Sequence, residues 1–402
     1  MHGTISDFSR LTAQLDAIQA ALREQRLDGW LLFDLHARNP VADWLLGLGD
    51  LTRRFFVLIP AAGEPVAITH GIEQQVWQNW PWRRERYSGW SELDDVLRRT
   101  LGAQRRVALE TSECNRVPAI DFVPAGVVEL VRAAGPEVVS SAELITMFYA
   151  SWSLEQYASH KRASVVLAAV ARAAFRRLSE QVREQGAGSE GELRQWVLDE
   201  LARRGAGVGA DSIVANGPNA ANPHYGPEGA GAPLRRGDLV LLDLWAKEAE
   251  DMIYADQTWM AVLDAQVGEA VQPIWAAVRD ARDAAVRFLR ESWSAAAPAR
   301  GFEVDDVARA VIRERGYGEH FIHRTGHSID RDTHGAGPNI DNYETHEVRR
   351  LIPGIGFSIE PGIYLPGSVG MRTELNVFIG SDGPEVTTPD PQRELFTLLE
   401  AP

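Results

Sequence analysis

The chain of 402 residues has a single cysteine, Cys114, and no long apolar run. One cysteine excludes an internal disulfide and any metal site built from several thiolates. No stretch approaches the roughly 18–20 apolar residues that a helix needs to cross a bilayer. Residues 1–8 also lack the basic region and apolar core of a secretory signal. We therefore expect a cytoplasmic protein with no membrane partner.

Clustered basic residues are scarce as well. The formal net charge is −15, and only short basic groups occur, such as Arg83-Arg84 and Arg235-Arg236. Because binding to nucleic acid requires clustered Lys and Arg to neutralise phosphates, a nucleic-acid partner is disfavoured. The hydrophobic content of 45% is that of an ordinary globular protein. A chain of this length exceeds a single hydrophobic core, so we expect two domains.

Residues 1–150 predict a small α/β domain. An amphipathic helix is expected over residues 6–26, with Ser6 as its N-cap. Strand-like runs follow at residues 30–33, 55–59 and 65–68. We interpret a group of tryptophans as core or interface residues, with direct substrate contact as the alternative. These are Trp77, Trp80, Trp82 and Trp90.

Residues 151–402 predict the second domain, which carries the chemistry. A long helix is expected over residues 154–185, because the stretch has few helix breakers and a glycine-containing segment follows it. The glycine-rich segment 205–210 is not a phosphate-binding loop, since no Gly-Lys-Ser/Thr follows and no strand leads into it. We interpret that segment as turns. Two further helices are expected over residues 267–293 and 304–315.

Three of the ten histidines fall within twelve residues: His323, His327 and His334. In a packed core each ring nitrogen needs its own partner, so this density, next to glycines, favours a functional site. A polar loop of solvated histidines is the alternative. His224 stands alone on a loop and by itself is more typical of a structural residue.

Two neighbouring apolar strands each contain one aspartate. Asp243 lies within the run 239–245, and Asp256 lies at the centre of the run 252–259. Antiparallel neighbours that each carry an inward aspartate would bring the two carboxylates close together. Like charges at that distance repel unless a proton or a cation lies between them. We therefore favour a metal site over a purely structural pair.

Two glutamates extend this pattern. Glu360 ends a strand directly before Pro361-Gly362, and Glu374 lies in a strand with Arg372 two positions earlier on the same face. Four carboxylates and the imidazole of His327 suit two divalent ions, such as Mn²⁺, Co²⁺ or Zn²⁺. Two such ions, about 3.5–4 Å apart, can share a water molecule that becomes a bridging hydroxide nucleophile. No His-Glu-x-x-His occurs, which excludes the single-zinc helical proteases.

With these residues in this order, the chain resembles the pita-bread (M24) metallopeptidases, which include methionine aminopeptidases, Xaa-Pro aminopeptidases and Xaa-Pro dipeptidases (prolidases). The resemblance is strong from residue 154 onward and weaker before it. It implies an α/β (α+β) fold, with a pita-bread catalytic domain over residues 151–402 and a smaller creatinase-type N-terminal domain over residues 1–150. The matching landmarks are Asn219 to His224-Tyr225, His323 with His327, His334, Glu360-Pro361-Gly362 and Arg372-Thr373-Glu374.

The resemblance also implies a role for each candidate metal ligand. Asp256 and Glu374 would bridge two metal ions. Asp243 would complete the ligands of one ion, whereas His327 and Glu360 would complete those of the other. Glu360 would in addition act as the general base or proton relay for the attacking water.

Four further residues receive roles from the same resemblance. His224 and His334 would stabilise the tetrahedral intermediate and hydrogen-bond the scissile carbonyl or the leaving nitrogen. His323 would lie in the substrate pocket, and Arg372 would orient Glu374 from behind the metal ligands. For His323 and Arg372, a role in packing alone is the alternative.

Three features depart from the family pattern. The two aspartates are farther apart than is usual, which lengthens the turn but preserves the facing of the strands, so we expect ligation to survive. Arg324 follows His323 where the family has small residues, which affects the expected substrate preference. Leu375-Asn376 stand where an acidic residue is common, which predicts weaker support for one metal site.

The resulting functional hypothesis is a homodimeric two-metal exopeptidase that hydrolyses Xaa-Pro dipeptides. An Xaa-Pro aminopeptidase acting on longer peptides shares the architecture and is the first alternative. Another hydrolase or lyase on this fold, such as a metal-free creatinase type, is disfavoured because all five ligands are present. A non-catalytic binding protein is disfavoured for the same reason and because the chain lacks a basic face.

Overall fold

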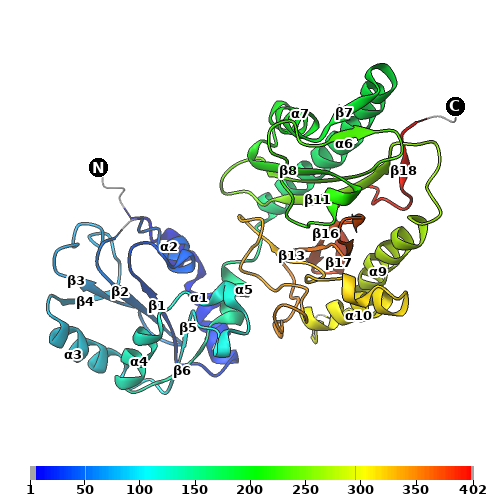
Figure 1. Ribbon diagram of the computed structural model, residues 1–402. Coiled ribbons are helices and arrows are strands. Elements are labelled where there is room, and N and C mark those ends of the chain that lie inside the picture. Colours follow the sequence, from blue (N-terminus) through cyan, green and yellow to red (C-terminus); the bar gives the residue numbers. More distant parts are fainter. Residues whose placement is uncertain (1–5, 50, 295, 400–402) are drawn as a thin grey trace. The chain divides into compact units, whose positions relative to one another are not determined.

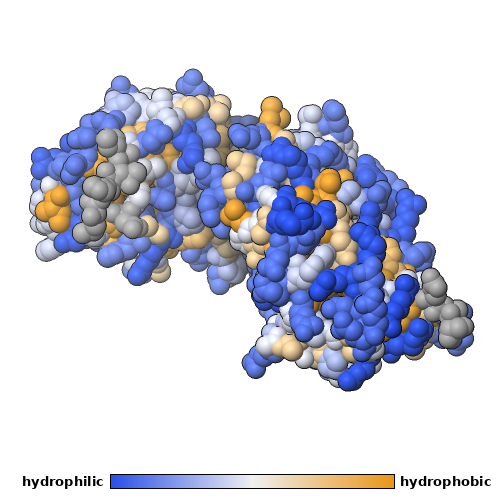
Figure 2. Space-filling model, turned by 90° about the horizontal axis from the view of Figure 1, so that it is seen from above, coloured by the Kyte–Doolittle hydropathy of each residue, from blue (hydrophilic) through white to orange (hydrophobic). Residues whose placement is uncertain are grey.

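The computed structural model describes residues 6–49, 51–294 and 296–399. The chain forms two compact units, Met1–Tyr149 and Ala150–Pro402, each with its own hydrophobic core (Figure 1). Among the described residues, no helix is both long and apolar enough to cross a membrane. The face seen in Figure 2 is mainly hydrophilic, with apolar residues in small separate patches.

The first unit is built on a six-stranded mixed sheet in the order β4-β3-β2-β1-β5-β6. Helix α1 packs with α2 and with α5, and α3 packs with α4 (Figure 1). Strand β1 is buried at every position, as expected for a central strand covered on both faces. The strands are β1 Gly29–Asp34, β2 Phe55–Pro60, β3 Val66–His70, β4 Arg83–Tyr87, β5 Arg106–Leu109 and β6 Glu137–Ser140. The helices are α1 Ser9–Glu24, α2 Pro40–Leu46, α3 Trp90–Leu101, α4 Ala125–Ala133 and α5 Ala142–Phe148, with 3₁₀ turns at Glu113–Asn115 and Pro118–Ile120.

Two expectations for this unit need correction. Ser6 is not the N-cap of α1, because Phe8 occupies that position and the Ser6 hydroxyl instead donates to the carbonyl of Val76 at 2.6 Å. Trp77 and Trp80 are core residues, as expected, but Trp90 is 74% exposed. Trp90 begins α3, where its ring lies on the solvent side of the helix.

The second unit has strands in its centre and helices on its outside. Helices α6 and α7 pack on the sheet β18-β11-β10-β8, whereas α9 and α10 pack together on the side of the sheet β12-β13-β16-β17 and the hairpin β14-β15. A short pair, β7-β9, lies at one edge. The helices are α6 Leu154–Gln185, α7 Glu190–Arg203, α8 Gly217–Ala220, α9 Gln272–Glu291 and α10 Gly301–Glu314, with a 3₁₀ turn at Gly318–His320. The strands are β7 Ala187–Ser189, β8 Val208–Asn216, β9 Pro233–Arg235, β10 Leu239–Lys247, β11 Ala255–Val262, β12 Ser328–Ile329, β13 Gly356–Ile359, β14 Gly362–Leu365, β15 Val369–Arg372, β16 Leu375–Gly380, β17 Gly383–Val386 and β18 Phe396–Thr397.

Helix α6 confirms the predicted long helix. Its start is fixed by a capping box, in which the side chains of Ser153 and Gln156 each accept a hydrogen bond from the backbone N–H of the other. Its end is fixed by Gly186, whose φ of 80° is the left-handed conformation that glycine adopts without strain. The observed helix therefore begins and ends where the sequence signals predicted.

The strand predictions near the candidate site were less accurate. Gly209 and Ala210 lie in β8, which pairs with β10, although the segment 205–210 was expected to form turns. Asp256 is the second residue of β11, because this strand starts at Ala255 and not at Met252. Glu374 lies in the short break between β15 and β16. In each case pairing with a distant strand set the boundary, and local composition does not encode that pairing.

Candidate metal centre

The register of β10 and β11 places the two aspartates on one face of their sheet. Asp243 pairs with Thr258, and Trp245 pairs with Asp256. Because side chains alternate between the faces of a strand, Asp243 and Asp256 are diagonal neighbours on the same face. Both carboxylates are buried. The longer connection between β10 and β11 therefore leaves the two aspartates facing the same side of the sheet, as expected.

The segment that carries His327 lies against β13. The backbone N–H of His327 donates to the Ser358 hydroxyl at 2.9 Å, and the backbone N–H of Glu360 donates to the Thr325 carbonyl at 2.7 Å. This close approach depends on Gly326, because a Cβ atom there would overlap the Ser358 carbonyl oxygen. The glycine between Thr325 and His327 thus allows the histidine to approach the residues at the end of β13.

The ring of His327 is oriented as a ligand. Its Nδ1 lies 3.1 Å from the Ser328 carbonyl, and since a carbonyl only accepts, Nδ1 carries the hydrogen. Nε2 is therefore directed toward the carboxylates, 3.2 Å from Glu360 Oε1 and 3.6 Å from Asp256 Oδ2. This arrangement, with one nitrogen fixed by the backbone and the other exposed to acidic groups, is common among metal-binding histidines.

Arg372 and Thr258 hold the remaining carboxylates in place. Arg372 donates to Asp243 Oδ2 at 2.6 Å and to the Thr258 hydroxyl at 3.1 Å. That hydroxyl in turn donates to Glu374 Oε2 at 3.0 Å. Arg372 therefore bonds Asp243 directly and connects to Glu374 through Thr258, an arrangement compatible with the expected role of orienting Glu374 from behind the metal ligands.

The residues present fit divalent metal ions. Among the described residues, three buried carboxylate oxygens of this cluster have no hydrogen-bond partner: Asp243 Oδ1, Asp256 Oδ1 and Glu374 Oε1. Asp256, His327 and Glu374 each offer a ligand atom within 4.8 Å of the others. A buried anionic oxygen without a partner is costly, and a cation in contact with it removes that cost.

The electrostatics of the cluster point the same way. Burial raises the pKa of Asp256, and the neighbouring charge of Asp243 raises it further. Burial and the charge of Asp256 likewise raise the pKa of Glu374 well above its usual value. Burial also raises the pKa of Glu360, but His327, Arg372 and His323 together more than offset this and hold it below the usual range. The raised pKa values of Asp256 and Glu374 show that these buried carboxylates are disfavoured as anions unless a proton or a cation compensates their charge.

His323 lies beside the cluster, with both ring nitrogens engaged. Nδ1 lies 2.6 Å from the Arg324 carbonyl and so carries the hydrogen, while Nε2 accepts from the Tyr364 hydroxyl at 2.8 Å. Tyr364 in turn accepts from Arg372 at 2.9 Å. Burial lowers the pKa of His323 to about 4, so its ring is neutral at physiological pH. These contacts connect His323 to Arg372 and leave it little capacity to bond a substrate.

His334 and His224 lie near the mouth of the same pocket. The His334 ring meets that of His327 edge-on, with centroids 4.4 Å apart. The charge of His327 and partial burial lower the pKa of His334 to about 4. His224 is exposed on the loop after α8. One pocket of about 640 Å³ is lined by all nine residues selected from the sequence: His224, Asp243, Asp256, His323, His327, His334, Glu360, Arg372 and Glu374.

Several residues of the site escaped the sequence analysis. Thr258 lies two positions after Asp256 on the same face, a spacing that could have identified it. Tyr364 gave no such signal, because only the β14-β15 hairpin brings it to Arg372. Asn376, one of the departures from the family pattern, accepts a hydrogen bond from the Asp256 backbone at 2.9 Å. It thus holds the β11 strand that carries a candidate ligand.

Comparison with known proteins places the chain among peptidases. Residues 158–381 match metallopeptidase family M24. The Xaa-Pro dipeptidase of Lactobacillus delbrueckii subsp. lactis is 36% identical over 173 residues, which is 43% of each chain. The Xaa-Pro dipeptidase of Pyrococcus furiosus is 32% identical over 186 residues, 46% of this chain and 49% of that protein. The matched region thus spans about half the length of these relatives.

Solved structures extend the likeness to the whole fold. Dipeptidase PepE from Mycobacterium ulcerans has a TM-score of 0.72 at 23% identity, covering 98% of this chain and 99% of that one. A dipeptidase from Pyrococcus horikoshii OT3 has a TM-score of 0.64 at 26% identity, covering 96% and 99%. The pita-bread fold and the predicted α+β class are therefore confirmed. With its family match over more than half of its length, the chain belongs to metallopeptidase family M24.

Proposed function

We propose that this protein is an exopeptidase that hydrolyses Xaa-Pro dipeptides with two divalent ions, Mn²⁺, Co²⁺ or Zn²⁺. Asp243, Asp256, His327, Glu360 and Glu374 would hold the ions. The observation that carries this proposal is the set of three buried carboxylate oxygens without partners, two of them on residues that offer ligand atoms together with His327. The Xaa-Pro dipeptidases among its relatives support the substrate.

The proposal assigns residues 151–402 as the catalytic domain and residues 1–150 as a creatinase- or prolidase-like N-terminal domain. All five proposed ligands lie in the second unit. We further propose that the enzyme acts as a homodimer in the cytoplasm. Sedimentation of the purified protein would test the dimer, since a monomer at micromolar concentration contradicts it.

The chain's own residues would position and protonate the substrate. Bound ions would supply Lewis acidity and lower the pKa of a water molecule so that it attacks the scissile carbonyl. Glu360 would take the proton from that water and deliver it to the leaving proline nitrogen. The Ser358 hydroxyl, 3.0 Å from Glu360 Oε1, fixes the carboxylate for this task. His334 and His224, at the pocket mouth, would donate hydrogen bonds to the developing oxyanion.

Arg324 supports a preference for dipeptides over longer chains. It lines the pocket of the metal centre, and its guanidinium has no hydrogen-bond or ion-pair partner among the described residues. The positive charge of Arg324 contributes to the lowered pKa of His334. In a dipeptide the free α-carboxylate follows the scissile bond within one residue, and arginine binds carboxylates with paired hydrogen bonds. A longer peptide has no charge at that position.

Hydrolysis assays on metal-stripped protein test the proposal. Xaa-Pro dipeptides and an Xaa-Pro-Xaa tripeptide are offered with and without added Mn²⁺, Co²⁺ or Zn²⁺. We expect metal-dependent cleavage of the dipeptides and weak cleavage of the tripeptide. Efficient cleavage of the tripeptide would indicate an aminopeptidase. If neither peptide is cleaved while two metal ions are bound per chain, the proposal that Xaa-Pro peptides are the substrates is contradicted.

A further inference from the structure

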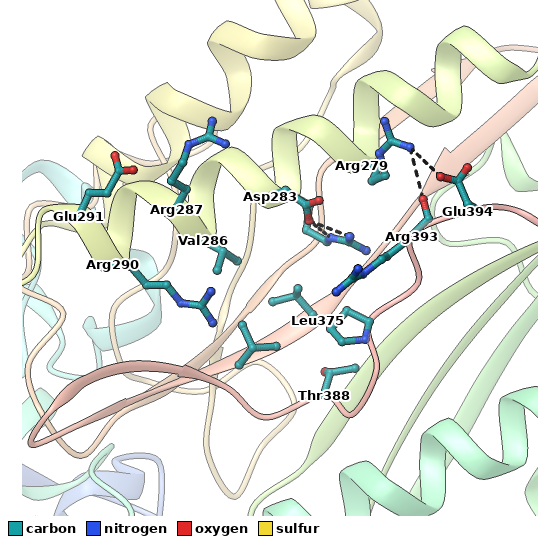
Figure 3. Close-up of a pocket in the computed structure, with 13 residues that line it drawn as sticks. Arg279, Asp283, Val286, Arg287, Arg290, Glu291, Leu375, Thr388, Arg393 and Glu394 are labelled. Carbon is teal, nitrogen blue, oxygen red and sulfur yellow. Dashed lines mark hydrogen bonds and ion pairs between the residues drawn. The ribbon is translucent and has the colours of Figure 1, made fainter.

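A second pocket of the catalytic unit lies along helix α9. It has a volume of about 850 Å³ and is lined by helix α9, by strands β16 and β17, and by residues 388–394 (Figure 3). Five arginines line it, in a chain whose net charge is −15. These are Arg279, Arg282, Arg287, Arg290 and Arg393. None of its lining residues lines the pocket of the metal centre.

Two of these arginines are neutralised by neighbouring acids. Arg279 bonds Asp280 at 2.9 Å, and Arg282 bonds Asp283 at 2.7 Å. The guanidinium groups of Arg290 and Arg393 have no hydrogen-bond or ion-pair partner among the residues that the structure describes, although the backbone carbonyl of Arg393 accepts from Trp275 and Arg279. Figure 3 shows both side chains extending toward the middle of the pocket from opposite sides, whereas Arg287 points away from it. Two free guanidinium groups therefore face one space.

Arg282 is the most deeply buried arginine that lines this pocket. Arg282 is only 2% exposed and is held by the Thr373 hydroxyl at 2.9 Å and the Gln392 carbonyl at 2.8 Å. Burial lowers the pKa of Arg282, the Asp283 carboxylate opposes this decrease, and the charges of Arg279 and Arg393 add to it. Asp283, Glu291 and Glu394 also line the pocket, so five arginines stand there against three carboxylates, and a bound anion would supply the missing negative charge.

The floor of the pocket is apolar. Leu375 and Val286 are buried, and Val386 is half-buried beside them. In Figure 3 Leu375 lies between the guanidinium groups of Arg290 and Arg393. A small inorganic anion would use the charges and leave this floor uncovered. An organic anion of moderate size would use both parts of the pocket.

We propose that this pocket binds an organic phosphate monoester. The phosphate, with a charge of about −1.5 to −2 at neutral pH, matches the two free guanidinium groups of Arg290 and Arg393. Arginine donates paired hydrogen bonds to phosphate oxygens. The organic part lies on the floor formed by Val286, Leu375 and Val386. The site is independent of the proposed peptidase activity, since none of its residues belongs to the metal centre.

Calorimetric titration of the full-length, metal-loaded protein tests the proposal. AMP is the organic probe and inorganic phosphate is the comparison, both at constant ionic strength. We expect saturable binding of one AMP per chain and weaker binding of inorganic phosphate. In the double variant Arg290→Gln/Arg393→Gln, the affinity for AMP should fall by about tenfold or more, which corresponds to ~1.4 kcal/mol.

A matched variant separates this site from general electrostatics. Arg176→Gln/Arg235→Gln removes the same charge from two exposed arginines outside the pocket, and its affinity for AMP should remain within about twofold of the parent. An equal loss in both double variants would overturn the proposal, as would the absence of saturable binding. Unchanged binding in Arg290→Gln/Arg393→Gln would place the phosphate elsewhere, for example at the metal centre. Equal affinities for AMP and inorganic phosphate would exclude a contribution of the organic part of the ligand to binding.

Discussion

At the scale of single residues, the candidate metal ligands are poorly accommodated unless cations are bound. Glu374 has one oxygen bonded to Thr258 and one without a partner, and it lies beside Asp256 in a buried cluster. Such a group is retained at a cost to stability, which is typical of residues selected for function. The neighbouring carboxylates are buried in the same way. Removing one of their charges and binding a metal ion should therefore both increase the stability of the folded protein.

Replacing Glu374 by Gln should therefore stabilise the metal-free protein and abolish its response to metal. One buried like charge is removed, but so is a proposed bridging ligand. In the parent, metal at about 100 times its dissociation constant should add ~2.7 kcal/mol of stability. Scanning calorimetry with and without Mn²⁺ measures both effects. Glu269→Gln, at an exposed position, serves as the control; a normal metal response in Glu374→Gln would contradict the ligand assignment.

Replacing Arg324 by Gln should raise KM for Xaa-Pro dipeptides by roughly 10–100-fold, the range of a charge-assisted hydrogen bond. The corresponding Xaa-Pro amides, which lack the carboxylate, should be affected little. Arg324→Lys retains the charge and should recover part of the loss. Steady-state kinetics on both substrate types distinguishes these effects. An equal change for acid and amide substrates would show that Arg324 acts on the pocket and not on the carboxylate.

At the scale of elements, a buried carboxylate joins the strands and helices of the first unit. Glu110, directly after β5, accepts hydrogen bonds from Trp30 Nε1 at 2.5 Å and Asn39 Nδ2 at 2.8 Å. Ser141, before α5, donates to it at 3.2 Å. Asn39 also accepts from Val41 N and so caps α2. This network connects β1, α2, β5 and α5 through one side chain.

Burial raises the pKa of Glu110 to about 7, so the first unit should lose stability as pH rises. The folded state holds the proton more tightly than the unfolded chain does. The contribution of protonated Glu110 to the free energy of unfolding is therefore complete below the ordinary carboxyl pKa. It is lost as pH rises through about 7, by up to ~3 kcal/mol. Glu110→Gln should remove this slope. Chemical denaturation between pH 5 and 8.5 measures it, and an unchanged slope in the variant would contradict the assignment.

At the scale of the whole molecule, each unit has its own core, and the candidate metal ligands lie only in the second. We therefore expect two calorimetric transitions. Chelation should lower only the transition of the second unit, because only that unit binds metal. Glu110→Gln should shift only the transition of the first unit, which shows which transition belongs to that unit. A single transition that moves as one with both treatments would show that the units unfold cooperatively.

Much of the fold was predictable because its signals are local. The capping residues and the terminal glycine fixed helix α6 to within a residue, since these groups satisfy the helix's own backbone. The extents of β8 and β11 were not predictable in this way. Gly209 lies in a strand because β10 offers a partner for its backbone, and no local preference encodes a partner that is distant in sequence.

The candidate site shows the same division. Five of its nine residues were identified from residue types and order and the other four through the family resemblance, and the structure places all nine around one pocket. Their connections were not identified. Arg372 was expected to orient Glu374, but its direct bond to Asp243 was not foreseen, because the hairpin β14-β15 and the register of β10 and β11 direct its guanidinium there. His323 is tied to Tyr364 for a similar reason.

The sequence by itself determined which chemical groups this protein offers: four carboxylates, several imidazoles and an ordered pattern that marks its family. Residue identity and spacing carry that information, because ligand chemistry depends on functional groups and strand periodicity on neighbours in the chain. Only the tertiary structure decided which oxygens are left without partners and which arginines remain free to bind an anion. Those properties depend on contacts among segments up to 129 residues apart, such as Arg372 with Asp243, and such contacts exist only once the chain has folded.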